Sequence, residues 1–216
     1  MPYKSTIYCF LLLIVALIGI FSYKRLTFPF KILAWSVLVV FVLNVISQYF
    51  IWKYRNNYII LHIESLTDYL FYAATYYYLF KNKLIKRLII VSIVGMSVFF
   101  FINALFLQPL QTVFPTYMYY PAQILFSLFS LLLFKEMLQY PLAINITKQS
   151  VFWFNTAILF YGTTMFFILG LTNYLAEHNL NDQFLFNFWY LIIYLFHIFI
   201  AFSFLTDNRD ISAKDA

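Results

Sequence analysis

The chain has 216 residues, of which 64% are hydrophobic, 24% aromatic and only 10% charged. A typical soluble domain is about 45–50% apolar and about 25% charged, so this chain has too few polar side chains to cover a water-soluble fold. Its single cysteine excludes an intrachain disulfide, and its four glycines exclude a glycine-rich nucleotide loop. The net charge of +6 is scattered along the chain, which argues against nucleic acid as a partner. The composition predicts an integral membrane protein.

Seven apolar stretches follow one another along the chain, each close to the roughly 20 residues that a helix needs to cross a bilayer. They lie near 6–23, 31–52, 59–80, 87–107, 117–139, 151–173 and 184–206. The run at 88–101 does not alternate between apolar and polar residues, as a strand of a membrane barrel would. We therefore expect an all-α, seven-transmembrane-helix bundle with antiparallel neighbours. Residues 1–206 form one domain in this prediction, and 207–216 form a short cytoplasmic tail.

Basic residues are divided unevenly between the two ends of the expected bundle. Eleven lie in the turns near 23–31 and 80–87, between spans five and six, and in the tail, whereas three lie at the opposite end. Lysine and arginine are retained on the cytoplasmic side of a membrane. We therefore expect the amino terminus outside, the carboxyl terminus in the cytoplasm, and a multi-pass protein of the cell inner (plasma) membrane.

Tyrosine and tryptophan favour the two membrane–water interfaces. A run of tyrosines at 76–78 is expected at the inner interface, and Tyr119 is among those expected at the outer one.

Span three carries two acids, Glu64 and Asp68, four residues apart and so on one helix face, which Tyr72 continues inward. Ionisable residues within a span are costly and are functional candidates that face the bundle interior. His62 points about 160° away from Glu64 around the helix, which argues against a His-x-Glu metal site. We expect this histidine close to the outer interface, where an unpaired histidine is unremarkable.

Span two carries two amides, Asn44 and Gln48, again four residues apart. An antiparallel hairpin that turns near residue 56 places Gln48 level with Glu64, and Asn44 level with Asp68. Amides donate hydrogen bonds to a carboxylate or pair with its protonated form, and burial and repulsion favour protonation of at least one acid. Two interpretations stay open: hydrogen bonds that only hold the helices together, and a ligand or ion site.

Other polar side chains lie at a similar depth in spans four, five and seven, whereas the inner half holds isolated ones such as Asn155. The arrangement predicts a small-molecule cavity that opens outward between the helices. The candidate ligand-binding residues are Asn44, Gln48, Glu64, Asp68, Tyr72, Asn103, Gln123, Asn187, Tyr190, Tyr194 and His197.

Sequence motifs for catalysis or cofactor binding are missing. The chain has no HExxH, GxSxG, P-loop or CxxC pattern. Its three histidines, at 62, 178 and 197, are too dispersed to bind haem. We therefore expect no catalytic residue, no metal and no cofactor, and a protein that is not an enzyme.

Several short motifs follow one another in a fixed order between about residues 22 and 175. They are Tyr-Lys-Arg-Leu before span two, the spacing from His62 to Asp68, the basic turn at 81–87, Phe134-Lys135-Glu136-Met137-Leu138, Phe152-Trp153-Phe154-Asn155 and Tyr161. In this order the chain resembles a family of uncharacterised bacterial seven-helix membrane proteins, some of them similar to the membrane sensor modules of histidine kinases. His62 departs from the amide expected there. The resemblance implies a sensor-like module, and the short tail implies no output domain of its own.

Three functions remain open at this point. The first is a receptor-like or sensory module that binds a small ligand in the outer half of the bundle and is read by a cytoplasmic or membrane protein partner. The second is an accessory membrane effector, oligomeric or pore-type, such as bacterial defence systems encode. The third is an intramembrane lipid enzyme that uses Glu64 and Asp68 as acid and base.

Overall fold

The computed structural model describes residues 2–139, 146–178, 180–181 and 183–207. These residues form seven long α-helices and two short helical turns, and they contain no strand. The helices are α1 (Pro2–Ser22), α2 (Phe28–Tyr54), α3 (Tyr58–Leu79), α4 (Lys83–Ile102), α5 (Thr116–Gln139), α6 (Ser150–Glu177) and α7 (Gln183–Thr206). A π-helical turn, η1 (Asn103–Leu107), extends α4, and a 3-10 turn, η2 (Ile146–Lys148), precedes α6. The predicted all-α fold is confirmed, and each predicted apolar stretch lies on a helix.

Six of the described helices are long and apolar enough to cross a membrane: α1, α2, α4 with its π-helical turn, α5, α6 and α7. This indicates an integral membrane protein. The exception is α3, which carries the acids Glu64 and Asp68 together with several other polar residues.

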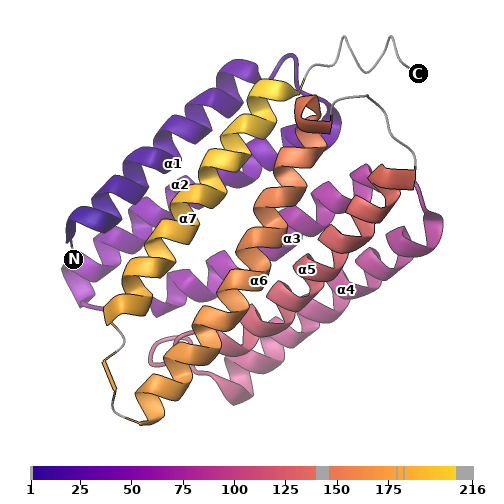
Figure 1. The fold of residues 1–216 in the computed structure, drawn as a ribbon. Helices are drawn as coiled ribbons and strands as arrows, with labels where there is room; N and C mark the ends of the chain where they lie inside the picture. Colours follow the sequence, from indigo (N-terminus) through magenta and orange to yellow (C-terminus); the bar gives the residue numbers. More distant parts are fainter. Residues whose placement is uncertain (1, 140–145, 179, 182, 208–216) are drawn as a thin grey trace.

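Six helices form a closed ring, and α4 lies outside it (Figure 1). Around the ring, α1 packs against α2, α2 against α3, α3 against α5, α5 against α6, α6 against α7, and α7 against α1. The helix α4 packs mainly against α3 and α5 and exposes most of its apolar surface. The interior of the ring is therefore lined by side chains from six helices, including the polar face of α3.

The turn between α2 and α3 lies at residues 55–57, as predicted. Arg55 adopts the left-handed conformation (φ 57°) and donates its N–H to the carbonyl of Ile51. The Asn56 side chain accepts a hydrogen bond from the Tyr58 N–H (2.8 Å) and donates one to the Gln111 carbonyl (2.5 Å). The hairpin is thereby attached to the connection between α4 and α5.

Antiparallel helices place the start of α1 and the end of α7 at opposite ends of the ring (Figure 1). At the end where α7 terminates, Asp207 joins three elements. One carboxylate oxygen accepts the Thr27 N–H (2.6 Å), and the other accepts the Ser150 hydroxyl (2.9 Å). Because Thr27 precedes α2 and Ser150 begins α6, this carboxylate closes one end of the ring.

A buried hydrogen-bond network joins α3, α5 and α6 in the half of the bundle nearer Asp207. The Tyr76 hydroxyl lies 2.5 Å from the Ser130 hydroxyl and donates to Asn155 Oδ1 (2.9 Å), while Asn155 Nδ2 donates to the Ser130 carbonyl (2.9 Å). Tyr76 is fully buried, so its predicted place in the inner aromatic belt is wrong. Asn155 is likewise not isolated, because burial requires its amide to find partners.

Candidate functional site

The polar face of α3 runs along the interior of the ring with one side chain per turn. Glu64, Asp68, Tyr72 and Tyr76 follow one another at four-residue spacing, which keeps them on one face of the helix. We call Glu64 and Asp68 the acid pair. Protein atoms surround both carboxyl groups, yet both side chains keep accessible surface.

Four tyrosines from four helices surround the acid pair, and we call them the tyrosine shell: Tyr8 of α1, Tyr72 of α3, Tyr119 of α5 and Tyr161 of α6. Each lies within electrostatic range of both Glu64 and Asp68. The shell is held by aromatic packing: the Tyr72 ring lies 5.8 Å, and the Tyr161 ring 4.7 Å, from the Phe196 ring of α7.

The acid pair has no internal partner among the described residues. No salt bridge or hydrogen bond to either carboxyl group is formed there, and Asp68 Oδ1 is buried without any partner. The hydroxyl of Tyr8 likewise forms no hydrogen bond within the described chain, although this side chain is only 9% exposed. Buried polar groups are normally hydrogen-bonded, so these groups can bind something that the described residues do not supply.

The predicted direct hydrogen bonds from Asn44 and Gln48 to the acids are not formed among the described residues, and pairing through a water molecule stays a prediction. The amides lie on α2 beside α3, but neither forms a hydrogen bond with a carboxyl group within the described residues. Asn44 is buried, and its Oδ1 has no partner.

The polar stripe on α7 is divided between two surroundings. Asn187 is exposed and accepts a hydrogen bond from Lys4 Nζ, and the Tyr194 hydroxyl donates to the Lys4 carbonyl (2.9 Å). Tyr190 packs against the small apolar cluster around Tyr8. Asn187 and Tyr194 therefore attach α7 to α1, whereas Tyr190 lies beside Tyr8 of the tyrosine shell.

His197 is the member of the α7 stripe that reaches the tyrosine shell, with its ring 5.4 Å from the Tyr8 ring. Its Nδ1 lies 2.9 Å from the Ile193 carbonyl oxygen, which can only accept a hydrogen bond. Nδ1 therefore carries the proton, and Nε2 of the neutral ring is left as an acceptor.

The two remaining candidates are Asn103 and Gln123, on different elements. Asn103 is fully buried at the start of the π-helical turn, and both of its side-chain polar atoms lack partners within the described part of the chain. It follows α4, outside the ring, so the structure does not bring it to the acid pair. Gln123 of α5 is buried at the contact with α6, where Gly162 allows close approach: a methyl group at Gly162 would lie 2.9 Å from Ser127 Oγ.

His62 is completely buried and is not the unpaired histidine that the sequence suggested. Its Nε2 donates to the Val113 carbonyl, 3.0 Å away, in the connection between α4 and α5. Together with the bond from Asn56 to Gln111, it attaches that connection to the hairpin of α2 and α3. The role of His62 that the structure shows is to hold this connection in place.

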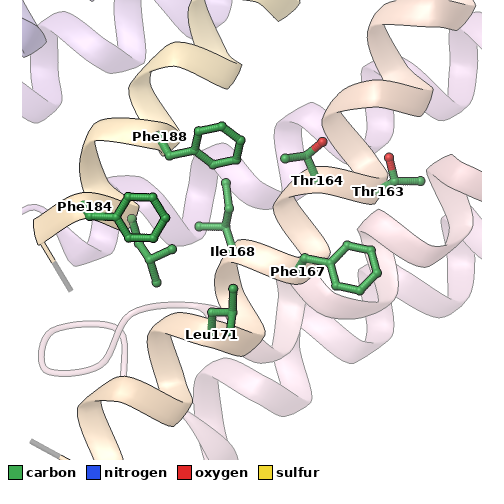
Figure 2. Close-up of a pocket in the computed structure, with 8 residues that line it drawn as sticks. Thr163, Thr164, Phe167, Ile168, Leu171, Phe184 and Phe188 are labelled. Carbon is green, nitrogen blue, oxygen red and sulfur yellow. The ribbon is translucent and has the colours of Figure 1, made fainter. Parts of the chain in front are cut away.

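A separate apolar groove lies between α6 and α7 (Figure 2). Phe184 and Phe188 of α7 lie across it from Ile168 and Leu171 of α6. It has a volume of about 270 Å³ and is lined by no charged residue and by none of the predicted site residues. Its chemistry suits an apolar group such as a hydrocarbon chain.

Comparisons of this chain with protein-family models, with curated proteins and with solved structures found no match. The function must therefore be argued from the side chains themselves.

Sequence reasoning identified the acid pair and Tyr72 but overlooked the rest of the shell. Tyr8 lies in the first span, which was interpreted only as a membrane segment, and Tyr161 entered the argument only through the family resemblance. Tyr119 was assigned to the outer aromatic belt. A tyrosine well inside an apolar span is a detectable signal, because a buried hydroxyl needs a polar neighbour.

Proposed function

We propose that this chain is a receptor-like sensory module of the bacterial inner membrane that binds a small ligand at the acid pair. In this proposal all seven helices span the membrane, with the amino terminus outside and the carboxyl terminus in the cytoplasm. The position of α3 in the ring supports its assignment as the seventh span. The polar residues that lower the mean hydropathy of α3 are covered by the neighbouring helices. The concentration of basic residues in the turns near Asp207 supports the orientation.

The observation that carries the proposal is the acid pair, deep inside a helical bundle and without a partner in the described chain. Intramembrane acids are normally paired or face a water-filled cavity, and they mark ligand or ion pathways. Here both carboxyl groups keep accessible surface and are surrounded by tyrosines from four helices. A binding role fits this geometry better than a catalytic one, because no described nucleophile is hydrogen-bonded to either acid.

The same face of α3 connects the proposed site to the cytoplasmic half of the bundle. Tyr72 belongs to the shell, and Tyr76, one turn further along, is bonded to Ser130 of α5 and Asn155 of α6. A ligand that shifts α3 by even a fraction of a turn would change these bonds. A protein partner at the cytoplasmic face could read that change, in keeping with the resemblance to sensor modules.

The topology is tested by fusing reporters to the carboxyl terminus of the full chain. A reporter active only in the cytoplasm should work, and one active only in the periplasm should remain silent. The opposite pattern would overturn the proposal, because the basic end of the bundle would then face away from cytoplasmic partners.

The water-accessible site is tested by cysteine labelling in a Cys9→Ser background, which removes the one native thiol. We expect Asp68→Cys to react with a small, positively charged, water-soluble thiol reagent added from outside. Val91→Cys, on the exposed apolar face of α4, should remain unreactive because it faces lipid, and Gln111→Cys in the exposed connection should react fully. If the Asp68→Cys variant reacts no faster than the Val91→Cys variant, the interior is closed and the receptor proposal fails.

A further inference from the structure

We infer that the basic end of the bundle binds an anionic phospholipid on its outer surface, where the α1–α2 turn meets the α3–α4 turn. This inference goes beyond the proposed function and does not depend on the acid pair. The observation that carries it is a set of aromatic rings in contact with one another and with two lysines. We call this set the basic belt: Tyr23, Phe28, Lys31, Tyr77, Tyr78 and Lys86.

An aromatic contact joins the two turns. The ring of Phe28, at the start of α2, lies 4.6 Å from the ring of Tyr78, at the end of α3. Tyr78 in turn lies 5.2 Å from the Tyr77 ring, and Lys86 Nζ of α4 lies over Tyr77, 5.1 Å from its centroid. Phe28 and Tyr78 are both about half exposed. The contact therefore lies on the outer surface of the bundle, with a lysine beside it.

A second lysine lies on the α1–α2 side of the same surface. Lys31 is one turn beyond Phe28 on α2, and its Nζ lies over the Tyr23 ring, 5.4 Å from the centroid. The Tyr23 hydroxyl accepts a hydrogen bond from Trp35 Nε1 (3.1 Å), which holds the ring beside the lysine. Neither Lys31 nor Lys86 forms a salt bridge or a hydrogen bond within the described residues. The N–H donors of both ammonium groups are therefore free to bind an anion.

The charge of the two turns also favours an anion. Residues 23–31 and 80–87 contain seven of the fourteen basic residues of the chain and no acid. The two acids described at this end, Glu136 and Asp207, already accept backbone N–H groups. Basic surfaces between membrane helices bind the headgroups of anionic lipids. A zwitterionic headgroup would instead place its own ammonium group beside the lysines.

The neighbouring surface of α2 selects a lipid over an acidic protein segment. Trp35 and Val42 follow Phe28 at seven-residue spacing, which keeps all three on one face of the helix. Each of them is about half exposed, so an apolar stripe leads from the basic belt toward the middle of the span. A lipid would place its phosphate at the lysines, which bind phosphate as point charges, and an acyl chain along this stripe. A polar acidic peptide has no apolar tail to cover it.

The test measures which lipid contacts Trp35, with brominated acyl chains as the fluorescence quencher. The full chain carries Trp52→Phe, Trp153→Phe and Trp189→Phe, so that Trp35 is its only tryptophan. It is reconstituted in phosphatidylcholine with increasing fractions of brominated phosphatidylglycerol or brominated phosphatidylcholine. One lysine near an anionic lipid contributes about fivefold in association, the equivalent of about 1 kcal/mol. With two lysines, we expect the association constant at Trp35 to favour phosphatidylglycerol at least tenfold.

Lysine variants separate the basic belt from a general attraction of anionic lipids to this end of the bundle. Lys31→Gln and Lys86→Gln should each lower the preference at Trp35 about fivefold, and the double variant should abolish it. Lys135→Gln is the matched control, because it removes the same charge from an exposed position on α5, outside the belt. The preference of the Lys135→Gln variant should equal that of the parent.

Thermal unfolding shows whether the single-tryptophan protein is folded. If it is not, native mass spectrometry of the parent chain and of the same lysine variants measures the preference from the bound phosphatidylglycerol and phosphatidylcholine. An equal loss of preference in the Lys135→Gln variant would overturn the inference, because charge alone would then explain the binding. Equal association of the two lipids would also overturn it, and would leave the two lysines to an acidic segment of a protein partner. Neither result changes the argument for the acid pair.

Discussion

Replacement of Asp207 tests how the basic end of the ring is held together. Asp207→Ala removes the acceptor of the Thr27 N–H at 2.6 Å and of the Ser150 hydroxyl at 2.9 Å. A buried donor left without a partner costs about 1–3 kcal/mol. For a chain of this size, 1 kcal/mol changes the melting temperature by about 2–4 °C, so the expected decrease is about 2–12 °C.

The pH dependence of stability identifies the carboxyl group itself. Burial raises the pKa of Asp207 above its ordinary value, although hydrogen bonds from Thr27 and Ser150 and the nearby Arg25 act in the opposite direction. Because the folded-state pKa exceeds the unfolded one, the contribution of this group to stability is complete below about pH 4 and is lost as the pH rises through the folded-state value. Asp207→Asn keeps an acceptor for the Thr27 N–H and should abolish this part of the pH dependence.

The assay is thermal unfolding of the full chain in one detergent, from about pH 4 to about pH 8, a range that begins near the ordinary pKa of an aspartate. At the upper end of that range, we expect Asp207→Asn to unfold close to the parent temperature or above it, and Asp207→Ala to unfold well below it. An Asp207→Ala melting temperature indistinguishable from that of the parent would refute the assigned role of the carboxylate.

Three further predictions concern packing and hydrogen bonding. Gly162→Ala should cost about 1–3 kcal/mol in stability, because its methyl group would lie 2.9 Å from a serine hydroxyl. Gly95→Ala, with no atom within 4 Å of the added methyl group, should be neutral or stabilise by up to about 1 kcal/mol. Equal melting temperatures of the two variants would contradict this prediction. Tyr76→Phe should lower stability by about 1–3 kcal/mol, since it leaves the buried Asn155 Oδ1 without a donor, while the Ser130 hydroxyl keeps its bond to the Asn155 carbonyl; unchanged unfolding would show that the network contributes little. His62→Leu should accelerate protease cleavage between residues 108 and 115, because the connection loses its bond to α3; a parent-like cleavage rate would contradict that.

The helices could be predicted from the sequence because long apolar runs and short connections leave few alternatives. The α2–α3 turn follows from the same pattern. The closed ring could not be predicted, since sequence order does not show that α3 packs against α5 while α4 remains outside.

Rotation of each helix about its own axis was the main source of error in the candidate site. The α7 stripe was expected to line the interior, yet Asn187 and Tyr194 contact Lys4 of α1. Amides and tyrosines are stable both at an interface and in a core, so a polar stripe does not by itself show which neighbour it faces. The acids were placed correctly in the interior because a carboxyl group facing lipid is far more costly.

A solved structure of the full chain in a lipid nanodisc tests the central claim most directly. The account predicts density for an ordered ligand beside Glu64 and Asp68, inside the ring, with the tyrosine shell around it. Carboxyl groups hydrogen-bonded to Asn44 and Gln48, with packed side chains filling the space between them, would contradict it and leave the polar residues as contacts that only hold the helices together.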